Sequence, residues 1–283
     1  MIDLNKYNNN VKPTWCPGCG NFGIHMAIKK ALSELDVEPN KAFMSFDIGC
    51  NGNGADKINI NAFKGLHGRS IPLAIGAKLA NRQLTVIADI GDGGVLHEGI
   101  EHLIHAIRSN YDITILIHNN QNFALTTGQA TATTQEDKQM YGLPDGRPER
   151  EINISKLALD NNATFVARTY SGDVLQMTDI LKKAINHKGC SVVEIMQYCP
   201  TYNKEASPQW FQEHIEKLEN TFDTIEEGIK STNMEKKIYT GIFFEETTIP
   251  TFYENLENRK DISTELVDEV KSRDIKKFLE KFK

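Results

Sequence analysis

Short apolar runs alternate with amphipathic stretches along most of the chain. In residues 22–35, for example, Ile24, Ala27, Ile28 and Ala31 fall on one helical stripe. The runs that predict strands are 42–48, 84–90, 113–118, 164–167 and 191–196, and the intervening predicted helices are 22–35, 71–79, 97–109, 154–159 and 174–185. Such alternation is typical of an α/β fold in which a parallel sheet has helices on both faces.

The pattern changes after position 200. Residues 204–235 are charged and amphipathic, 238–244 predict an edge strand, and 264–283 predict a helix rich in lysine and glutamate. The polar stretch 119–146 reads as a long loop, and loops of that length in compact domains are usually functional. We therefore expect one main domain over residues 1–203 and a C-terminal extension over 204–283 that contacts another subunit.

Composition narrows the range of possible functions. The chain has 283 residues and a net charge of −6, which argues against a role on nucleic acids or membrane surfaces, since those need a basic face. It contains no apolar run of about 18 residues that could cross a membrane. Residues 1–6 lack the apolar core of a signal peptide, so a cytoplasmic protein is expected.

Two predicted neighbouring strands end on oxygen-bearing side chains. Asp92 follows the run 84–90 and Asn120 follows the run 113–118, with one predicted crossover helix between them. Ligands of open α/β folds bind at the carboxyl edge of the sheet, where both residues should lie. Carboxylate and amide oxygens suit a small divalent cation that also holds phosphates. The arrangement is typical of a magnesium and thiamine diphosphate site.

The flanking glycines give the Gly-Asp-Gly segment a physical role. Gly91 and Gly93 are expected to let the backbone approach phosphate oxygens and to take positive φ, and the following helix offers free amide protons. The backbone carbonyl of Asn122 could be a third cation ligand. A Gly-Asp-Gly alone is common turn chemistry, but this one does not continue as a dinucleotide fingerprint, because Leu96 stands where glycine is needed.

Four of the five cysteines predict a metal site. Cys16 and Cys19 form a C-x-x-C pair. Cys50 and Cys199 each follow a predicted strand, so these two can face the same end of the sheet. Iron–sulfur clusters and zinc both satisfy this ligand set. A cofactor chemistry that releases electrons favours iron. Cys190 is expected to be a small core residue.

Several motifs together resemble the β subunit of the 2-oxoacid:ferredoxin oxidoreductases. The matching segments are 14–21, 48–50, 66–69, 84–93, 104–106, 110–114, 125–129 and 198–201, with 239–243 similar to the family's closing strand. The resemblance covers residues 10–204 and implies a thiamine diphosphate-binding fold. It implies oxidative decarboxylation of a 2-oxoacid, such as pyruvate or 2-oxoglutarate, to acyl-CoA and carbon dioxide. The electrons pass through a 4Fe-4S cluster to ferredoxin.

The resemblance also assigns residues. It implies that Asp92, Asn120 and the Asn122 carbonyl hold magnesium and that His67 contacts the diphosphate. It implies a cofactor lining of Ile48, Gly49, Cys50, Asn51, Gly91, Gly93, Gly94, Ala124 and Leu125, and a 4Fe-4S cluster on Cys16, Cys19, Cys50 and Cys199. In this family the glutamate that activates the aminopyrimidine lies on the partner α subunit, so no catalytic residue is expected on this chain alone.

Two positions depart from the family pattern. Position 94 is glycine where the family usually has aspartate, and position 127 is threonine where a lysine is often found, which leaves the identity of the 2-oxoacid open. Two other interpretations remain possible from the sequence. One is an iron-free thiamine diphosphate-dependent decarboxylase or synthase subunit, and the other is a non-catalytic electron-transfer or assembly subunit on the same scaffold.

Overall fold

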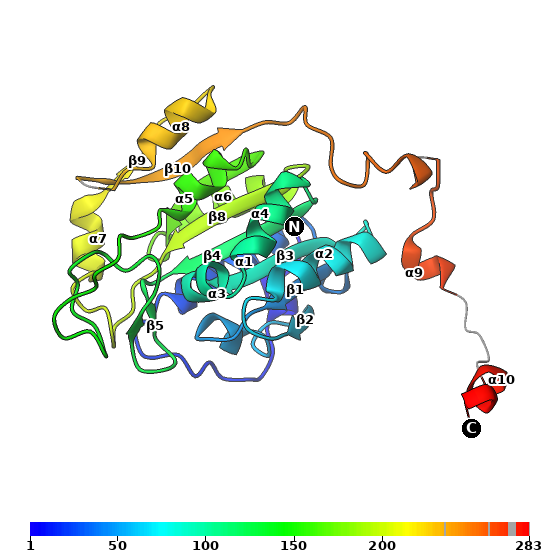
Figure 1. Cartoon of the computed structure of the whole chain (residues 1–283), viewed down its shortest axis with the longest axis horizontal. Helices are drawn as coiled ribbons and strands as arrows, with labels where there is room; N and C mark the ends of the chain where they lie inside the picture. Colours follow the sequence, from blue (N-terminus) through cyan, green and yellow to red (C-terminus); the bar gives the residue numbers. More distant parts are fainter. Residues whose placement is uncertain (235, 260, 271–275, 283) are drawn as a thin grey trace.

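β4 and β8 lie in the middle of a mostly parallel sheet (Figure 1). The computed structural model describes residues 1–234, 236–259, 261–270 and 276–282. Within these ranges, eight strands pair in the order β2-β1-β3-β4-β8-β7-β10-β9. Their bounds are β1 Ala42–Phe46, β2 Asn61–Lys64, β3 Thr85–Gly91, β4 Ile113–Asn119, β7 Phe165–Tyr170, β8 Cys190–Met196, β9 Ile215–Lys217 and β10 Ile238–Glu245. All neighbours are parallel except β7 and β10, which confirms the predicted parallel sheet.

Helices cover both faces of the sheet. α1 and α6 pack on one face, where Leu32 and Leu181 are buried, and α2, α4 and α5 pack on the other, where Leu103 and Leu159 are buried. The helices are α1 Asn21–Glu34, α2 Ser70–Ala80, α3 Asp92–His97, α4 Ile100–Arg108, α5 Ile154–Asp160, α6 Val174–Asn186, α7 Pro208–His214, α8 Ile225–Ser231, α9 Leu266–Glu269 and α10 Lys276–Leu279. None of the helices in the described ranges is long and apolar enough to cross a membrane.

The helix predicted over 97–109 forms as α4, but the expectation of a single crossover helix is wrong. α3 begins at Asp92 and ends at His97, and α4 begins at Ile100. The break lies at Gly99, where a Cβ atom would stand 2.5 Å from the carbonyl oxygen of Gly68. The chain bends there because the loop at Gly68 packs directly against its backbone. This contact holds the loop that carries His67 beside α3.

Two predictions for the C-terminal region are also wrong. β10 is not at the edge of the sheet, because β9 pairs along its outer side. β9 has three residues, too few to show a period-2 pattern in the sequence. The predicted helix over 264–283 is not continuous, since residues 264–265 and 270 are not helical. Among the described residues of this segment, the short α9, α10 and a 3-10 helix over Glu280–Phe282 form. Residues 271–275 and 283 of that prediction lie outside the described residues.

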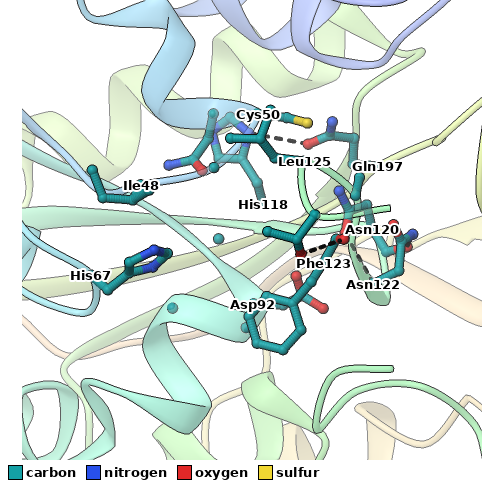
Figure 2. Close-up of a pocket in the computed structure, with 17 residues that line it drawn as sticks. Ile48, Cys50, His67, Asp92, His118, Asn120, Asn122, Phe123, Leu125 and Gln197 are labelled. Carbon is teal, nitrogen blue, oxygen red and sulfur yellow. Dashed lines mark hydrogen bonds between the residues drawn. The ribbon is translucent and has the colours of Figure 1, made fainter. Parts of the chain in front are cut away.

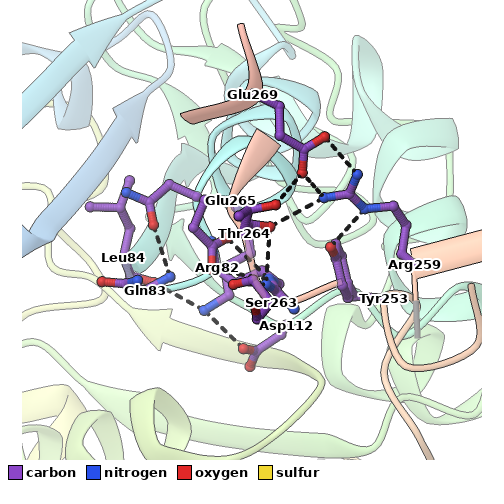
Figure 3. Close-up of polar contacts among 12 residues, drawn as sticks. Arg82, Gln83, Leu84, Asp112, Tyr253, Arg259, Ser263, Thr264, Glu265 and Glu269 are labelled. Atoms are coloured by element: carbon purple, nitrogen blue, oxygen red, sulfur yellow. Dashed lines mark hydrogen bonds and ion pairs between the residues drawn. The ribbon is translucent and has the colours of Figure 1, made fainter. Parts of the chain in front are cut away.

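Side-chain contacts fasten the segment after β10 to the amino end of the sheet (Figure 3). Glu265 is buried and accepts hydrogen bonds from the backbone and the guanidinium of Arg82, at 2.8 and 3.0 Å. The Arg82 guanidinium also lies 4.2 Å from the ring centroid of Tyr253. Arg259 donates to the Tyr253 hydroxyl at 3.0 Å and pairs with Glu269 at 2.7 Å. These contacts, rather than an apolar stripe, hold the segment in place.

A buried ion pair joins β7 and β8. Arg168 Nε lies 2.9 Å from Glu194 Oε2, and the two side chains are 0% and 1% exposed. Asn119 and Ser155 also donate to the Glu194 carboxylate, at 2.7 and 2.5 Å. Burial by itself would raise the pKa of Glu194, but Arg168 and these hydrogen bonds bring it below its ordinary value.

We expect Glu194→Leu to lower the free energy of unfolding by about 3–5 kcal/mol, because it leaves the Arg168 guanidinium buried without a partner. Urea denaturation of both proteins measures the difference. Because the folded-state pKa is lowered, the pair stabilises the fold above the unfolded pKa, and this is lost as pH falls through the folded pKa. Asp160→Ala, in the half-exposed pair with Lys156, is the control and should cost no more than about 0.5 kcal/mol. A loss of similar size in both variants would contradict the expectation.

Candidate functional site

The carboxyl ends of β1, β3 and β4 surround a cavity (Figure 2). Every residue that the sequence assigned to the cofactor or the cation lines it. The lining comprises Ile48, Gly49, Cys50, Asn51, His67, Gly91, Asp92, Gly93, Gly94, His118, Asn120, Asn122, Phe123, Ala124, Leu125, Thr126 and Gln197. The chain therefore brings together, in one cavity, residues that are far apart in the sequence, from Ile48 to Gln197.

Asp92 lines this cavity and is the first residue of α3. It is 2% exposed, and its Oδ2 accepts hydrogen bonds from Thr131 Oγ1 at 2.7 Å and Thr133 Oγ1 at 2.6 Å. Burial raises the pKa of the Asp92 carboxyl to about 6, against the opposite effect of the two hydroxyls. These hydrogen-bond donors are neutral, so a cation in the cavity would supply the charge that a buried carboxylate needs.

The two asparagines after β4 offer further oxygen atoms. Asn120 Oδ1 accepts from the Asn122 backbone at 3.1 Å, whereas the buried Asn122 Oδ1 has no hydrogen-bond partner. The Asn122 carbonyl accepts from the Ala124 backbone at 3.0 Å and keeps one lone pair free. Figure 2 shows both asparagines on the same side of the cavity as the Asp92 carboxylate. This oxygen set fits a magnesium ion.

The glycines flanking Asp92 do not adopt a positive φ, and Gly93 is needed for close packing. Gly91 has φ −77°, and Gly93 is helical, so the expectation of positive φ is wrong. A Cβ atom at Gly93 would stand 2.2 Å from the ring of Phe123. Phe123 belongs to a two-residue strand, β5 Asn122–Phe123, that pairs with β6 Gln129–Ala130 inside the loop predicted from the sequence. Glycine at 93 therefore lets this small hairpin close over α3.

The absence of a side chain at position 94 is explained by Asp47, which directly follows β1. A Cβ atom at position 94 would stand 1.8 Å from Asp47 Oδ2. Asp47 Oδ1 accepts from the Gly68 backbone at 2.8 Å, and burial raises the pKa of Asp47 to about 6. A carboxyl group is thus present beside position 94 although residue 94 is not itself acidic. No side chain fits at 94 while Asp47 keeps this conformation.

His67 reaches the cavity from the loop between β2 and α2. Its side chain is 49% exposed, and its Nδ1 lies 3.4 Å from Glu98 Oε2. The ring is thus at the mouth of the cavity and free on one side (Figure 2). This is a suitable place for a contact with an anionic group.

The four predicted cluster cysteines line a second cavity. Its lining comprises Thr14, Trp15, Cys16, Cys19, Cys50, Asn53, Asn120, Ala124, Leu125, Gln197, Cys199, Pro200, Thr201 and Tyr202. Five of these residues also line the first cavity and form a shared wall, namely Cys50, Asn120, Ala124, Leu125 and Gln197. Cys190, by contrast, is the first residue of β8 and is buried in the apolar core, as expected.

The four thiols lie close enough to interact electrostatically. Among the residues that the structure describes, no group of three or more His, Cys, Asp or Glu side chains is arranged as a single-ion site. Burial, and then the nearby thiols, raise the pKa of Cys50 to about 12, and burial also raises that of Cys19. Because metal ligation requires thiolates, metal binding at this cavity must release protons.

Four residues of the first cavity were not found from the sequence: His118, Phe123, Thr126 and Gln197. His118 had a detectable signal, because it is a polar residue inside the apolar run of β4 and close to its carboxyl end. Phe123, Thr126 and Gln197 lie in or beside loops, where no periodic pattern shows which way a side chain points.

Comparison with known proteins matches two adjacent parts of the chain. Residues 47–195 match the family described as "Thiamine pyrophosphate enzyme, C-terminal TPP binding domain". Residues 199–261 match the family described as the C terminal of the pyruvate ferredoxin oxidoreductase beta subunit. A 2-oxoacid:ferredoxin oxidoreductase β subunit from Aeropyrum pernix is 38% identical over 267 residues, which are 89% of this chain and 84% of that protein. The chain belongs to the 2-oxoacid:ferredoxin oxidoreductase β-subunit family.

Other members of the 2-oxoacid:ferredoxin oxidoreductase family agree in sequence and in fold. The β subunit from Saccharolobus solfataricus is 39% identical over 85% of this chain and 81% of its own length. A solved structure of "2-oxoglutarate:ferredoxin oxidoreductase from Magnetococcus marinus with 2-oxoglutarate, coenzyme A and succinyl-CoA bound" superposes with a TM-score of 0.88 and 28% identity. The superposition covers 100% of this chain and 96% of the other. The predicted fold, family and enzyme class are therefore confirmed.

Proposed function

We propose that this β subunit binds thiamine diphosphate, magnesium and a 4Fe-4S cluster, and works with an α subunit in the oxidative decarboxylation of a 2-oxoacid. The products are an acyl-CoA and carbon dioxide, and ferredoxin takes the electrons. The observation that carries this proposal is the pair of adjoining cavities with a shared wall of five residues. One holds the oxygen atoms suited to a cation, and the other holds the four cysteines.

In the first cavity, we assign magnesium to Asp92, Asn120 and Asn122, and the diphosphate contact to His67. Support comes from the unpartnered Asn122 Oδ1 and from the neutral donors around the Asp92 carboxylate. Thiamine diphosphate, when bound, supplies a carbanion and an electron sink for decarboxylation. The chain itself holds and orients the cofactor, and the Phe123 hairpin packed on Gly93 restricts water at the diphosphate end.

In the second cavity, we favour a 4Fe-4S cluster over zinc. Four cysteines that line one cavity suit either metal centre. The proposed decarboxylation releases electrons, which a four-iron cluster can accept and a zinc ion cannot. The cluster would accept and pass on electrons from the adjoining cavity.

The substrate belongs to the 2-oxoacids, with pyruvate and 2-oxoglutarate as the candidates. The Magnetococcus marinus relative was solved with 2-oxoglutarate, coenzyme A and succinyl-CoA. A Mycobacterium tuberculosis relative named 2-oxoglutarate oxidoreductase subunit KorB is 36% identical over 70% of this chain and 53% of its own length. Steady-state assays of the α/β complex with each acid decide between the two.

The α subunit would cover the open side of the two cavities and supply the glutamate for the aminopyrimidine. Large apolar side chains are exposed around these openings: Leu125 is 51% exposed and Tyr202 is 38% exposed. We further propose that residues 1–203 form the cofactor-binding domain and that the extension 204–283 contacts a partner chain. The cytoplasm is the proposed location of the complex.

The isolated β subunit should be inactive, because the activating glutamate is assigned to the other chain. We expect no measurable reduction of ferredoxin or viologen with a 2-oxoacid and coenzyme A, and activity when the α subunit is added. Turnover by the isolated chain would contradict this assignment.

Anaerobic purification tests the cluster. We expect a brown protein with about four irons per chain by elemental analysis, as a 4Fe-4S cluster requires. A colourless protein that contains zinc would instead support the interpretation as an iron-free thiamine diphosphate-dependent enzyme.

A further inference from the structure

Two buried amides point their NH₂ groups at one cysteine of the second cavity. Asn21 Nδ2 lies 3.5 Å from Cys19 Sγ, and Gln197 Nε2 lies 3.7 Å from the same sulfur. Both are hydrogen-bond distances for a sulfur acceptor. Asn21 and Gln197 are each 2% exposed, so water does not compete for these groups.

The His118 ring contacts the carbonyl oxygens of both amides. Its Nδ1 lies 3.1 Å from Asn21 Oδ1 and 3.1 Å from Gln197 Oε1. In this arrangement Nδ1 donates to the two carbonyl oxygens and Nε2 donates to the Asp89 carboxylate, so both ring nitrogens act as donors. With both oxygens engaged by His118, both NH₂ groups are directed to Cys19. The contacts to His118 and the contacts to Cys19 are therefore consistent with the same orientation of each amide.

Asp89 contacts the other ring nitrogen of His118. His118 Nε2 lies 2.8 Å from Asp89 Oδ2, and Asn51 Nδ2 donates to Asp89 Oδ1 at 2.8 Å. Asp89 and His118 are 2% and 5% exposed. Asp89, His118 and the two amides therefore form one buried network that begins beside the first cavity and ends on Cys19 Sγ.

We propose that Asn21 and Gln197 are positioning residues that set the reduction potential of the cluster through Cys19, and that His118 and Asp89 act through them. This inference rests on the proposed cluster. Hydrogen bonds to the sulfur atoms of a cluster raise its reduction potential, because they stabilise the more negative, reduced state. Removing these donors lowers the potential.

The network also joins the two halves of the site. His118 and Gln197 line the first cavity (Figure 2). Cys19 lines only the second. The hydrogen bonds pass through the shared wall at Gln197. The same side chain thus faces the proposed electron donor and holds a ligand of the proposed electron acceptor.

The test is the midpoint potential of the cluster in the α/β complex, followed by EPR during a redox titration. Gln197→Met removes the donor at similar length and without adding charge, and should move the potential to more negative values. Asn21→Ser is a second variant at the same sulfur and should shift it in the same direction. Gln212→Met, at an exposed position of α7, is the matched control and should leave the potential unchanged.

His118→Leu separates a positioning role from a merely structural one. It should lower the potential, and Gln197→Met with His118→Leu should shift it less than the sum of the single changes, since both act on one donor. Unchanged potentials in variants with full iron content would overturn the inference and leave the proposed function intact. Wild-type protein without iron would overturn the cluster assignment and this inference together.

Discussion

Asp92→Ala is expected to abolish magnesium-dependent binding of thiamine diphosphate. The change removes the one carboxylate among the assigned magnesium ligands, from a buried position where water replaces it poorly. Loss of groups that only support a metal ligand costs about 10–100-fold, so loss of the ligand itself should weaken binding by more than about 100-fold. Isothermal titration of thiamine diphosphate, with and without magnesium, measures the effect.

The matched control for this change is Asp145→Ala, at an exposed position in the polar loop between β6 and α5. It should bind the cofactor as the wild-type protein does. Equal affinity of the Asp92→Ala variant and the wild type would contradict the magnesium assignment. Absence of thiamine diphosphate binding in the wild-type chain would support the interpretation as a non-catalytic electron-transfer subunit.

Gly94→Asp is expected to destabilise the protein although aspartate is the usual residue at this position in the family. A Cβ atom there would stand 1.8 Å from Asp47 Oδ2, and the added carboxylate would face another buried carboxyl. Overpacking alone costs about 1–3 kcal/mol, and a second buried acid adds to it, so we expect a loss of at least about 3 kcal/mol. Chemical denaturation gives the free energy of unfolding.

The double variant Asp47→Ala with Gly94→Asp should recover most of this loss. The carboxylate at 94 then occupies the space that Asp47 leaves, and can accept the hydrogen bond from the Gly68 backbone. A double-mutant cycle over the two positions should give a coupling free energy of about 2–3 kcal/mol. Additive effects would contradict the view that one carboxyl group replaces the other. Asp47→Ala alone is the second arm of the cycle.

The sequence was sufficient for the central strands and for the ends of those strands. β3 and β4 are mostly apolar runs, and in a parallel sheet their carboxyl ends must meet, so Asp92 and Asn120 could be placed in one site. The same reasoning placed Cys50 and Cys199 in one site, since they come shortly after β1 and β8. Neither inference needs the direction of a side chain.

What the sequence could not predict depends on such directions. Asp47 reaches position 94 from the end of a neighbouring strand, and His118 meets Gln197, which lies 79 positions further along the chain. The close packing of Gly99 on the Gly68 backbone joins two segments that lie about thirty residues apart, and no local pattern predicts it. β9 pairs with β10 through three residues that carry no pattern of their own. Each of these features is decided by tertiary packing.

The segment fastened by Arg82 and Glu265 lies at the opposite end of β3 from the first cavity. Arg82 precedes the first residue of β3, whereas Gly91 at the other end lines that cavity. Val270, just after α9, is 78% exposed. A tether attached there would leave both cavity openings facing solution, so surface-immobilised protein should keep its affinity for thiamine diphosphate. This segment is therefore a suitable attachment point for biosensor measurements of cofactor binding by the isolated β subunit.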